Sequence, residues 1–417
     1  MINFERFELP NGLKVLVHQD FTTPIVAMSV LYDVGARDED PNRTGFAHLF
    51  EHLMFGGSVN IPRYDEPLEK VGGENNAFTS NDITCYHLSV PKPNIETAFW
   101  LESDRMMGLA FSAKSLKVQK NVVKEEFRQT HLNQPYGDAW LLLRPLAYKV
   151  HPYRWSTIGA DINHIESAAM SDVKDFFRRF YHPSNAILTL AGPVTIEEIK
   201  ELCKKWFGDI PARVKPLRTL PQEPVQAEAR LLEVEKPVPH HAIYKAWHIG
   251  QRLNHDYYTA DLTSDILSAG DSARLYVSLV KKRRLFSDIN AFITGSNDPG
   301  LFVVSGKVME GVNMTQANSA IEEEVAKLTY HLCEPREIQK VKNRVESLLL
   351  FSEIKVVEKA INISHFELLG DASMINRELE RYCEVTPDTI HDFAKRTFRS
   401  ENCSTLYYYA KNLRYDN

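Results

Sequence analysis

The 417-residue sequence lacks paired cysteines, a long apolar run and an excess of positive charge. Its five cysteines are odd in number and show no C-x-x-C spacing, which argues against a disulfide framework or a cysteine zinc site. No stretch approaches the roughly 18 apolar residues that a membrane helix needs. The formal net charge of -6 gives no basic footprint for nucleic acid. We therefore expect neither a membrane span nor a nucleic-acid partner.

The first residues also lack the features of a signal peptide. Met1 to Glu8 contains neither a basic n-region nor an apolar h-region. We expect a cytoplasmic protein, or a periplasmic one if a leader has been removed. The composition, 43% hydrophobic and 25% charged, is typical of a globular protein. Because a chain of this length is too long to fold around one ordinary hydrophobic core, two or more domains are expected.

The most informative feature present is a group of polar residues inside the apolar run from Thr44 to Gly57. In a helix, His48, Glu51 and His52 are related by i, i+3 and i+4, so they share one face. Zinc binds neutral imidazoles, and a hydrolytic zinc site leaves a position for water that a nearby carboxylate can deprotonate. The order H-x-x-E-H is the inverse of the zinc motif H-E-x-x-H.

The alternative is that these residues only belong to a structural helix. Burying two imidazoles and a carboxylate without a metal or partners would cost several kcal/mol, which disfavours that alternative.

The local patterns around this motif place it between regular elements. The β-branched segment Ile25 to Tyr32 predicts a central strand, and Thr44 is a plausible N-cap for the helix that carries the motif. Gly56 and Gly57 are expected to end that helix. Apolar residues at helical intervals predict two further helices between Asn94 and Gln129.

A second segment, Val71 to Val90, has a glycine pair followed by a β-prone, half-polar run. It predicts a strand at the edge of a sheet, where an extended peptide can add as a further strand. An ordinary hairpin explains the segment equally well.

The two halves of the chain resemble each other. The segments Asp175 to Asn185 and Asp392 to Asn402 match at Asp, Phe, Arg and Asn with one offset of 217, and an apolar strand follows each. Between the halves lies a proline-rich linker with Pro211, Pro216, Pro221 and Pro224. A duplicated α/β domain of about 210 residues is the simplest explanation. Chance similarity of two amphipathic helices is the alternative.

Several of these segments together resemble one family of enzymes. They are the H-x-x-E-H segment, Gly72 to Thr79, Glu102-Ser-Asp104-Arg105-Met106 and the Glu125-Glu126 helix. The chain is similar to the insulinase, or pitrilysin-like (M16), zinc peptidases, and in length to the bacterial relatives of the mitochondrial processing peptidase β subunit.

The resemblance implies an α+β fold of two homologous α/β domains. Each would have a mixed, largely antiparallel sheet packed with helices on one face. The expected domains are an N-terminal zinc-binding catalytic domain (1–210), a linker (211–228) and a structurally related C-terminal domain (229–417).

The same resemblance implies that His48, His52 and a Glu on a later helix bind Zn2+, with Glu51 as the general base. The V-x-x-x-E context selects Glu126 as the third ligand. Its neighbour Glu125 is the alternative, but adjacent helical residues point about 100° apart, so only one can face the metal.

By the same resemblance, Asn76, Ala77 and Phe78 lie along the strand that holds the substrate backbone. The expected activity is zinc-dependent endopeptidase hydrolysis of unstructured peptides, with Glu51 acting on a water activated by zinc. The alternative is a non-catalytic or partner-dependent subunit that acts in assembly or peptide binding.

The sequence departs from the family pattern at three positions. An acidic residue common seven positions before the ligand Glu is replaced by Gln119. An Arg and a Tyr that follow an S-R-L-like segment in many active members are replaced by Val280 and Ser287. We therefore expect a homodimer, or a heterodimer with an M16 subunit that carries the Arg and Tyr. The basic run Lys281 to Arg284 is more typical of a solvated helix face than of a substrate clamp.

Overall fold

The computed structural model describes residues 1–411, which form two compact units. Unit 1 comprises residues 1–128, 155–220 and 350–377, and unit 2 comprises residues 129–154, 221–349 and the described residues from 378 onward. Each unit is therefore assembled from three separate segments of the chain. Within residues 1–411, no helix is both long enough and apolar enough to cross a membrane.

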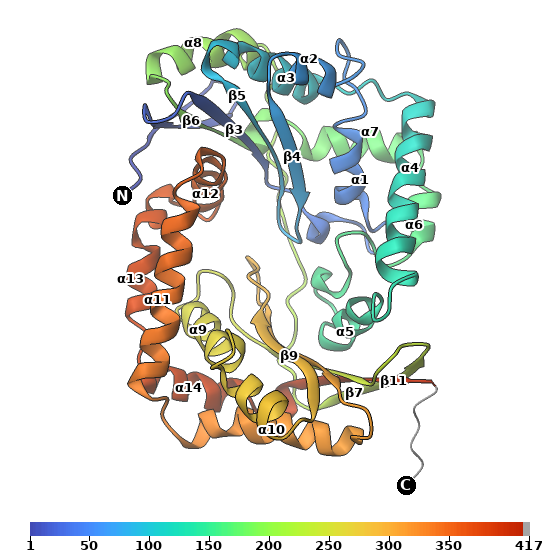
Figure 1. The fold of residues 1–417 in the computed structure, drawn as a ribbon. Coiled ribbons are helices and arrows are strands. Elements are labelled where there is room, and N and C mark those ends of the chain that lie inside the picture. Colours follow the sequence, from blue (N-terminus) through green and yellow to red (C-terminus); the bar gives the residue numbers. More distant parts are fainter. Residues whose placement is uncertain (412–417) are drawn as a thin grey trace. The chain divides into compact units, whose positions relative to one another are not determined.

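Unit 1 contains a six-stranded mixed sheet in the order β1-β2-β6-β3-β5-β4 (Figure 1). Only β2 and β6 pair in parallel, and the other neighbours are antiparallel. The central strand β3 is apolar and buried on both faces, as its β-branched sequence predicts. The strands are β1 (Glu5–Glu8), β2 (Lys14–Gln19), β3 (Ile25–Tyr32), β4 (Glu74–Thr79), β5 (Thr84–Pro91) and β6 (Ala186–Gly192).

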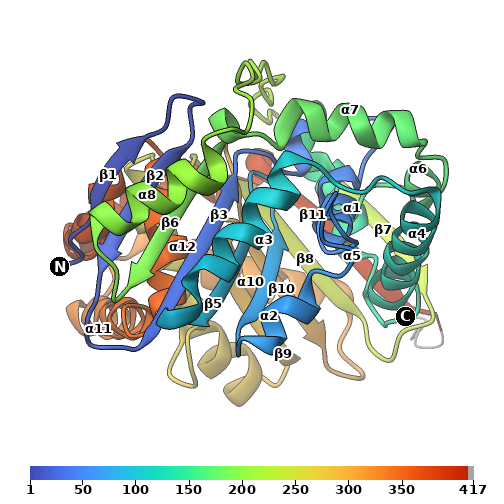
Figure 2. The same cartoon turned by 90° about the horizontal axis from the view of Figure 1, so that it is seen from above.

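Most helices of unit 1 lie on one face of this sheet. In Figure 2, α3 and α8 lie in front of the sheet, and α3 packs on β3 and β5 while α8 packs on β2. The helices are α1 (Phe46–Leu53), α2 (Asp65–Lys70), α3 (Ile95–Met107), α4 (Ala113–Phe127), α6 (Ile162–Glu166), α7 (Met170–Phe180), α8 (Ile196–Phe207) and α12 (Val356–Leu368). The two helices predicted between Asn94 and Gln129 are thus confirmed as α3 and α4.

One late helix covers the opposite face of the sheet. In Figure 1, α12 lies beside β3, and it packs on β3 and β6. Ala360 contacts Ala27 and Ala191, whose small side chains let the helix approach the strands closely. The hydroxyl of Ser364 donates to Thr189 at 2.8 Å. Both faces of the central strands are therefore covered.

Unit 2 contains a five-stranded sheet in the order β7-β11-β8-β10-β9. Only β7 and β11 pair in parallel. The strands are β7 (Arg230–Lys236), β8 (Ala242–His248), β9 (Phe286–Ile293), β10 (Leu301–Val308) and β11 (Cys403–Ala410). The helices are α5 (Ala139–Ala147), α9 (Asp256–Ser268), α10 (Met314–Tyr330), α11 (Pro335–Ser352), α13 (Glu378–Cys383) and α14 (Pro387–Thr397).

The early helix α5 covers one face of the unit 2 sheet. It packs on β7, β8 and β11, and Ala139 and Leu143 join a core cluster with Ala246 and Leu406. The helices α9, α10 and α14 cover the opposite face of the same sheet. Their buried residues form a second core cluster with Ile243 and Phe302 of the strands.

The predicted duplication is present in the fold. Adding 217 to the bounds of β5 and α7 gives the bounds of β10 and α14. The same offset places α5 within α12, so each half of the sequence supplies its copy of this helix to the unit built mainly from the other half.

The predicted fold class is confirmed: two related units, each with a mixed, largely antiparallel sheet packed against helices. One detail differs from the prediction, which placed helices on one face only. The apolar faces of α5 and α12 cover the second face of each sheet.

The predicted linker, residues 211–228, contains no helix or strand, and the boundary between Leu220 and Pro221 falls within it. The division into domains 1–210 and 229–417 stays a prediction about the duplicated halves. The compact units cross it, because residues 129–154 pack in unit 2 and residues 350–377 pack in unit 1.

Candidate metal centre and edge strand

The helix α1 begins at Phe46, and Gly45 rather than Thr44 is its N-cap. Gly45 has φ +88°, and a Cβ there would lie 2.7 Å from the Ile158 carbonyl oxygen, so the position requires glycine. The buried carboxylate of Glu39 accepts hydrogen bonds from the amides of Gly45 and Ala47, each at 2.8 Å. Burial raises the pKa of the Glu39 carboxyl well above its ordinary value, while the two amides at the positive end of α1 favour its ionised form. The prediction of Thr44 as N-cap was wrong because Glu39 satisfies these amides from outside the helix.

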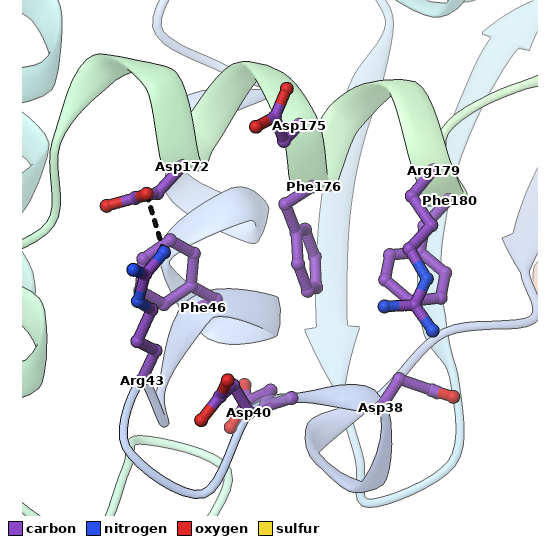
Figure 3. A pocket seen from close by; sticks show the side chains of 10 residues that line it. Asp38, Asp40, Arg43, Phe46, Asp172, Asp175, Phe176, Arg179 and Phe180 are labelled. Atoms are coloured by element: carbon purple, nitrogen blue, oxygen red, sulfur yellow. Dashed lines mark hydrogen bonds and ion pairs between the residues drawn. The ribbon is translucent and has the colours of Figure 1, made fainter. Parts of the chain in front are cut away.

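The first turn of α1 is held against α7 beside a hollow of about 180 Å³ (Figure 3). Arg43 donates to Asp172 of α7 at 2.6 Å. Phe176 points from α7 toward the hollow, and its ring centroid lies 5.9 Å from that of Phe46. None of the sequence-predicted site residues lines this hollow, which is bordered by residues 38–40, Arg43, Phe46, Asp172, Asp175, Phe176, Arg179 and Phe180.

The two histidines of α1 meet a carboxylate from α4. The Nε2 atoms of His48 and His52 lie 3.5 and 3.2 Å from the two carboxylate oxygens of Glu126. One ligand atom from each residue can be chosen so that all three lie within 4.8 Å of one another. The helices α1 and α4 run side by side in Figure 1 and are in contact. The structure therefore brings together the three residues predicted as ligands; their role as ligands stays a prediction.

The chemistry of this donor set fits zinc. Two imidazole nitrogens and a carboxylate oxygen are among the donors that zinc prefers, and three protein ligands leave a position for water or substrate. Burial lowers the pKa of His48 despite the opposing charge of Glu126, which favours the neutral imidazole that binds metals. The side chains are partly accessible, with exposed fractions of 12% for His48 and 25% for His52.

Of the two adjacent glutamates, only Glu126 faces the histidines. Glu125 is exposed and lies 3.6 Å from Arg128 of the next turn. Because Val123 and Phe127 of the same helix are buried, α4 has a fixed orientation that directs Glu126 toward α1. The choice of Glu126 over Glu125 in the sequence therefore agrees with the geometry.

The proposed base is held by a residue that the sequence did not single out. The hydroxyl of Thr79, at the end of β4, donates to Oε2 of Glu51 at 2.6 Å. Alternation along β4 could have revealed this contact, because Asn75, Ala77 and Thr79 point to the same face of a strand.

The strand β4 is an edge strand of the unit 1 sheet, and it also forms a hairpin with β5. The predicted edge position and the predicted hairpin are thus both present in one element, and the addition of a peptide to it stays a prediction. Asn76 is exposed, Ala77 is half-buried and Phe78 is 37% exposed. Their predicted role in substrate binding is not tested by these positions.

A buried ion pair supports the segment that follows α1. Arg105 and Glu102 on α3 are each 1% exposed, and the guanidinium donates to both oxygens of Glu102. The Arg105 guanidinium carbon lies 5.2 Å from the ring centroid of Phe55, 4.5 Å from that of Tyr64 and 4.4 Å from that of Tyr86. These cation–π contacts are favourable when the cation is desolvated.

A third residue of the same motif binds the loop directly. Asp104 accepts hydrogen bonds from the Ser58 hydroxyl and from the backbone and side chain of Asn60. The Glu102-Ser-Asp104-Arg105 segment therefore holds the chain between α1 and α2 in place.

The three positions at which the sequence departs from the family pattern lie on different elements. Gln119 lies on α4 near the end of α1, since its Nε2 would be 3.6 Å from a Cβ built on Gly56. Val280 lies in the helical turn Tyr276–Lys282, and Ser287 is exposed on the edge strand β9. Within unit 2, neither position supplies a guanidinium or a phenol.

Two family models match the sequence. The model described as "Insulinase (Peptidase family M16)" matches residues 14–146, and the model described as "Peptidase M16 inactive domain" matches residues 168–345. The first range contains His48, Glu51, His52 and Glu126.

Individual proteins show the same similarity. The zinc protease PqqE of Helicobacter pylori is 29% identical over 375 residues, covering 88% of this chain and 81% of the relative. The uncharacterized zinc protease YmxG of Bacillus subtilis is 23% identical over 96% of this chain and 97% of the relative. A probable mitochondrial-processing peptidase subunit beta of Arabidopsis thaliana is 25% identical over 82% of this chain and 66% of the relative.

Among solved structures, a protease from Helicobacter pylori superimposes with a TM-score of 0.92 and 25% identity. The match covers 98% of this chain and 100% of that chain.

Proposed function

Since the chain belongs to the insulinase (M16) peptidase family, we propose that it is a zinc metalloendopeptidase whose metal is held by His48, His52 and Glu126. The observation that carries this proposal is the convergence of two Nε2 atoms and one carboxylate from two different helices. When bound, zinc would act as a Lewis acid toward water and the scissile carbonyl.

In this proposal Glu51 is the general base. It lies on the same face of α1 as the histidines, one turn after His48 and next to His52. Its Oε2 accepts a hydrogen bond from the Thr79 hydroxyl, and its carboxylate takes a proton from the attacking water. The same carboxyl group then donates the proton to the leaving amine, which completes general acid–base catalysis of amide hydrolysis.

The proposed substrates are unstructured peptides that add to the edge of β4. Asn76, Ala77 and Phe78 would lie along the peptide backbone, and main-chain hydrogen bonds would supply most of the affinity. Because such binding contacts the peptide backbone more than its side chains, we expect broad specificity for the peptide sequence.

We also propose that full activity depends on a second chain. Val280 and Ser287 stand where many active members carry an Arg and a Tyr. A homodimer cannot restore that pair, whereas a heterodimer with an M16 subunit that carries it can. Addition of such a subunit should raise kcat, and full peptide hydrolysis by the purified chain alone would overturn partner dependence.

The second candidate is a non-catalytic subunit that keeps the fold for assembly or peptide binding. The description "inactive domain" of the model that matches residues 168–345 favours this candidate for the second half of the chain. The first half retains all four residues of the proposed centre, which a subunit without catalysis does not need. The compartment stays a prediction: cytoplasmic, or periplasmic if a leader has been removed.

Zinc content and peptide cleavage should be measured for the wild type and for Glu51→Gln, with and without a partner subunit. We expect about one zinc per chain in both proteins, because Glu51 is not a ligand in this proposal. Only the wild type should cleave an unstructured peptide. Absence of zinc from both proteins would overturn the proposed function, and zinc in both with no cleavage by either would support the non-catalytic alternative.

A further inference from the structure

Thr79 connects the candidate substrate edge to the proposed base. It is the last residue of β4, it is half-buried, and its hydroxyl donates to Oε2 of Glu51 at 2.6 Å. A threonine hydroxyl on an ionised carboxylate is a charge-assisted hydrogen bond, which is shorter and stronger than a neutral one.

The backbone of Thr79 faces the open side of the edge strand. At the turn, the Ser80 amide donates to the Ile83 carbonyl, so the next pair, Thr79 and Thr84, is a non-hydrogen-bonded pair of the antiparallel ladder. The Ala77 amide obeys the same alternation: it donates to the Asn76 side chain rather than to β5. The amides and carbonyls of Ala77 and Thr79 are therefore directed away from β5, where an added strand would pair.

We infer that Thr79 is a positioning residue that fixes the Glu51 carboxylate relative to a peptide paired with β4. This inference rests on the proposed function. One residue makes both contacts: its backbone faces the added strand and its hydroxyl holds the base. A shift of the edge strand would therefore reach the Glu51 carboxylate through the Thr79 hydroxyl.

The need for such a contact follows from the side chain of Glu51. Glutamate has three rotatable bonds, and its terminal torsion has broad, shallow minima, so α1 fixes its backbone without fixing its carboxylate. Productive proton transfer requires the base within hydrogen-bond reach of the water. The Thr79 hydroxyl supplies the missing constraint.

The first test is crystallographic and independent of activity. Structures of the wild type, Thr79→Val and Thr79→Ser should be compared at the Glu51 side chain. Valine matches the shape of threonine without the hydroxyl, and serine keeps the hydroxyl. We expect Glu51 to move or to adopt two conformers in Thr79→Val and to keep its wild-type position in Thr79→Ser. An unmoved Glu51 in Thr79→Val would overturn the inference.

A matched control is Thr84→Val, which removes a threonine hydroxyl from the opposite strand of the same hairpin. That hydroxyl donates to the Val34 carbonyl at 2.9 Å and does not bond Glu51. We expect this variant to leave Glu51 in place. Displacement of Glu51 in both valine variants would assign the effect to general disturbance of the hairpin and overturn a specific role for Thr79.

The second test is kinetic, in zinc-loaded protein with any required partner subunit. We expect Thr79→Val to lower kcat about tenfold or more, with KM changed less than about twofold and zinc content unchanged. Thr79→Ser should restore most of kcat. A rise in KM with unchanged kcat would overturn the positioning role. If the wild type binds no zinc, the proposed function fails separately, and the crystallographic comparison still decides the role of Thr79.

Discussion

The Nε2 atom of His52 lies 3.2 Å from a carboxylate oxygen of Glu126, although the two residues belong to different helices. The approach depends on the orientation of α4, whose buried residues Val123 and Phe127 flank the glutamate pair on its inner side. A neighbouring carboxylate, Glu125, is directed away toward Arg128. Of these two adjacent glutamates, Glu126 is the proposed ligand and Glu125 is its natural control.

Replacement of Glu126 by Gln should therefore remove the metal, whereas replacement of Glu125 by Gln should not. Loss of one of three protein ligands weakens a zinc site far more than loss of an exposed surface charge. Metal analysis of the two purified variants beside the wild type is the measurement. Equal zinc content in Glu126→Gln and the wild type would contradict the ligand assignment.

The ion pair of Arg105 and Glu102 should contribute strongly to the stability of unit 1 around the chain between α1 and α2. Arg105→Met leaves the Glu102 carboxylate buried without its cation, and we expect a loss of about 3–5 kcal/mol in the free energy of unfolding. The double variant Glu102→Gln with Arg105→Met should recover part of this loss, because no charge remains buried. Denaturant unfolding of both variants tests this, and a double variant no more stable than Arg105→Met would disprove the explanation.

The carboxylate of Glu39 should contribute to α1 more than an exposed cap contributes to another helix. Glu39→Ala leaves the amides of Gly45 and Ala47 without their acceptor in a buried environment, at a cost of about 2–3 kcal/mol. The control is Asp161→Ala, which removes an exposed cap of α6 and should cost about 1 kcal/mol. Thermal and denaturant unfolding compare the two. Similar costs would argue against a special role for Glu39.

The contact between Lys359 of α12 and Asp20 should make stability depend on pH. Lys359 donates to Asp20 at 2.7 Å, and this hydrogen bond holds the pKa of Asp20 well below its ordinary value of 3.8. Because the folded state then binds the proton less readily than the unfolded state, the contribution is complete above the ordinary value and is lost as the pH falls below it.

Asp20→Asn should therefore be less stable than the wild type by about 1 kcal/mol at pH 7, with a smaller difference at about pH 3. Glu66→Gln is a suitable control, because its pair with Arg63 is highly exposed and should contribute little at either pH. Urea unfolding at the two pH values is the measurement. A difference that is constant with pH would exclude an ionised Asp20 as the cause.

The sequence predicted those parts of the site that depend on local spacing. The positions of His48, Glu51 and His52 follow from helical periodicity, and the bounds predicted for Ile25 to Tyr32 are those of β3. The choice between Glu125 and Glu126 needed the family resemblance, since spacing within α4 does not say which face meets α1. Neither Glu39 nor Thr79 was assigned a role. Glu39 lies only six residues before Gly45, but the spacing does not show that its side chain folds back onto the start of α1. Alternation places Thr79 on one face of β4, but it does not show that Glu51, 28 residues away in the chain, lies against that face.

The sequence also did not show which sheet α5 and α12 pack against. The apolar residues of α5 and α12 predict helices with one buried face, but such a face is equally suited to either sheet. Ala360 packs on Ala27 and Ala191 because all three side chains are small and let the helix approach the strands. This fit depends on the helix and the sheet together, so neither segment shows it alone. The exchange of these helices between the halves could be recognised only in three dimensions.

That exchange has a consequence for how the chain acquires its structure on the ribosome. The strands of unit 1 are complete once β6 has emerged, yet one face of the sheet stays uncovered until α12, ending at Leu368, has been translated. The nascent first half therefore exposes Ala27, Leu31 and Ala191 to solvent or to chaperones during much of translation. A chain truncated at the linker would keep that apolar face exposed, because α12 lies after the linker.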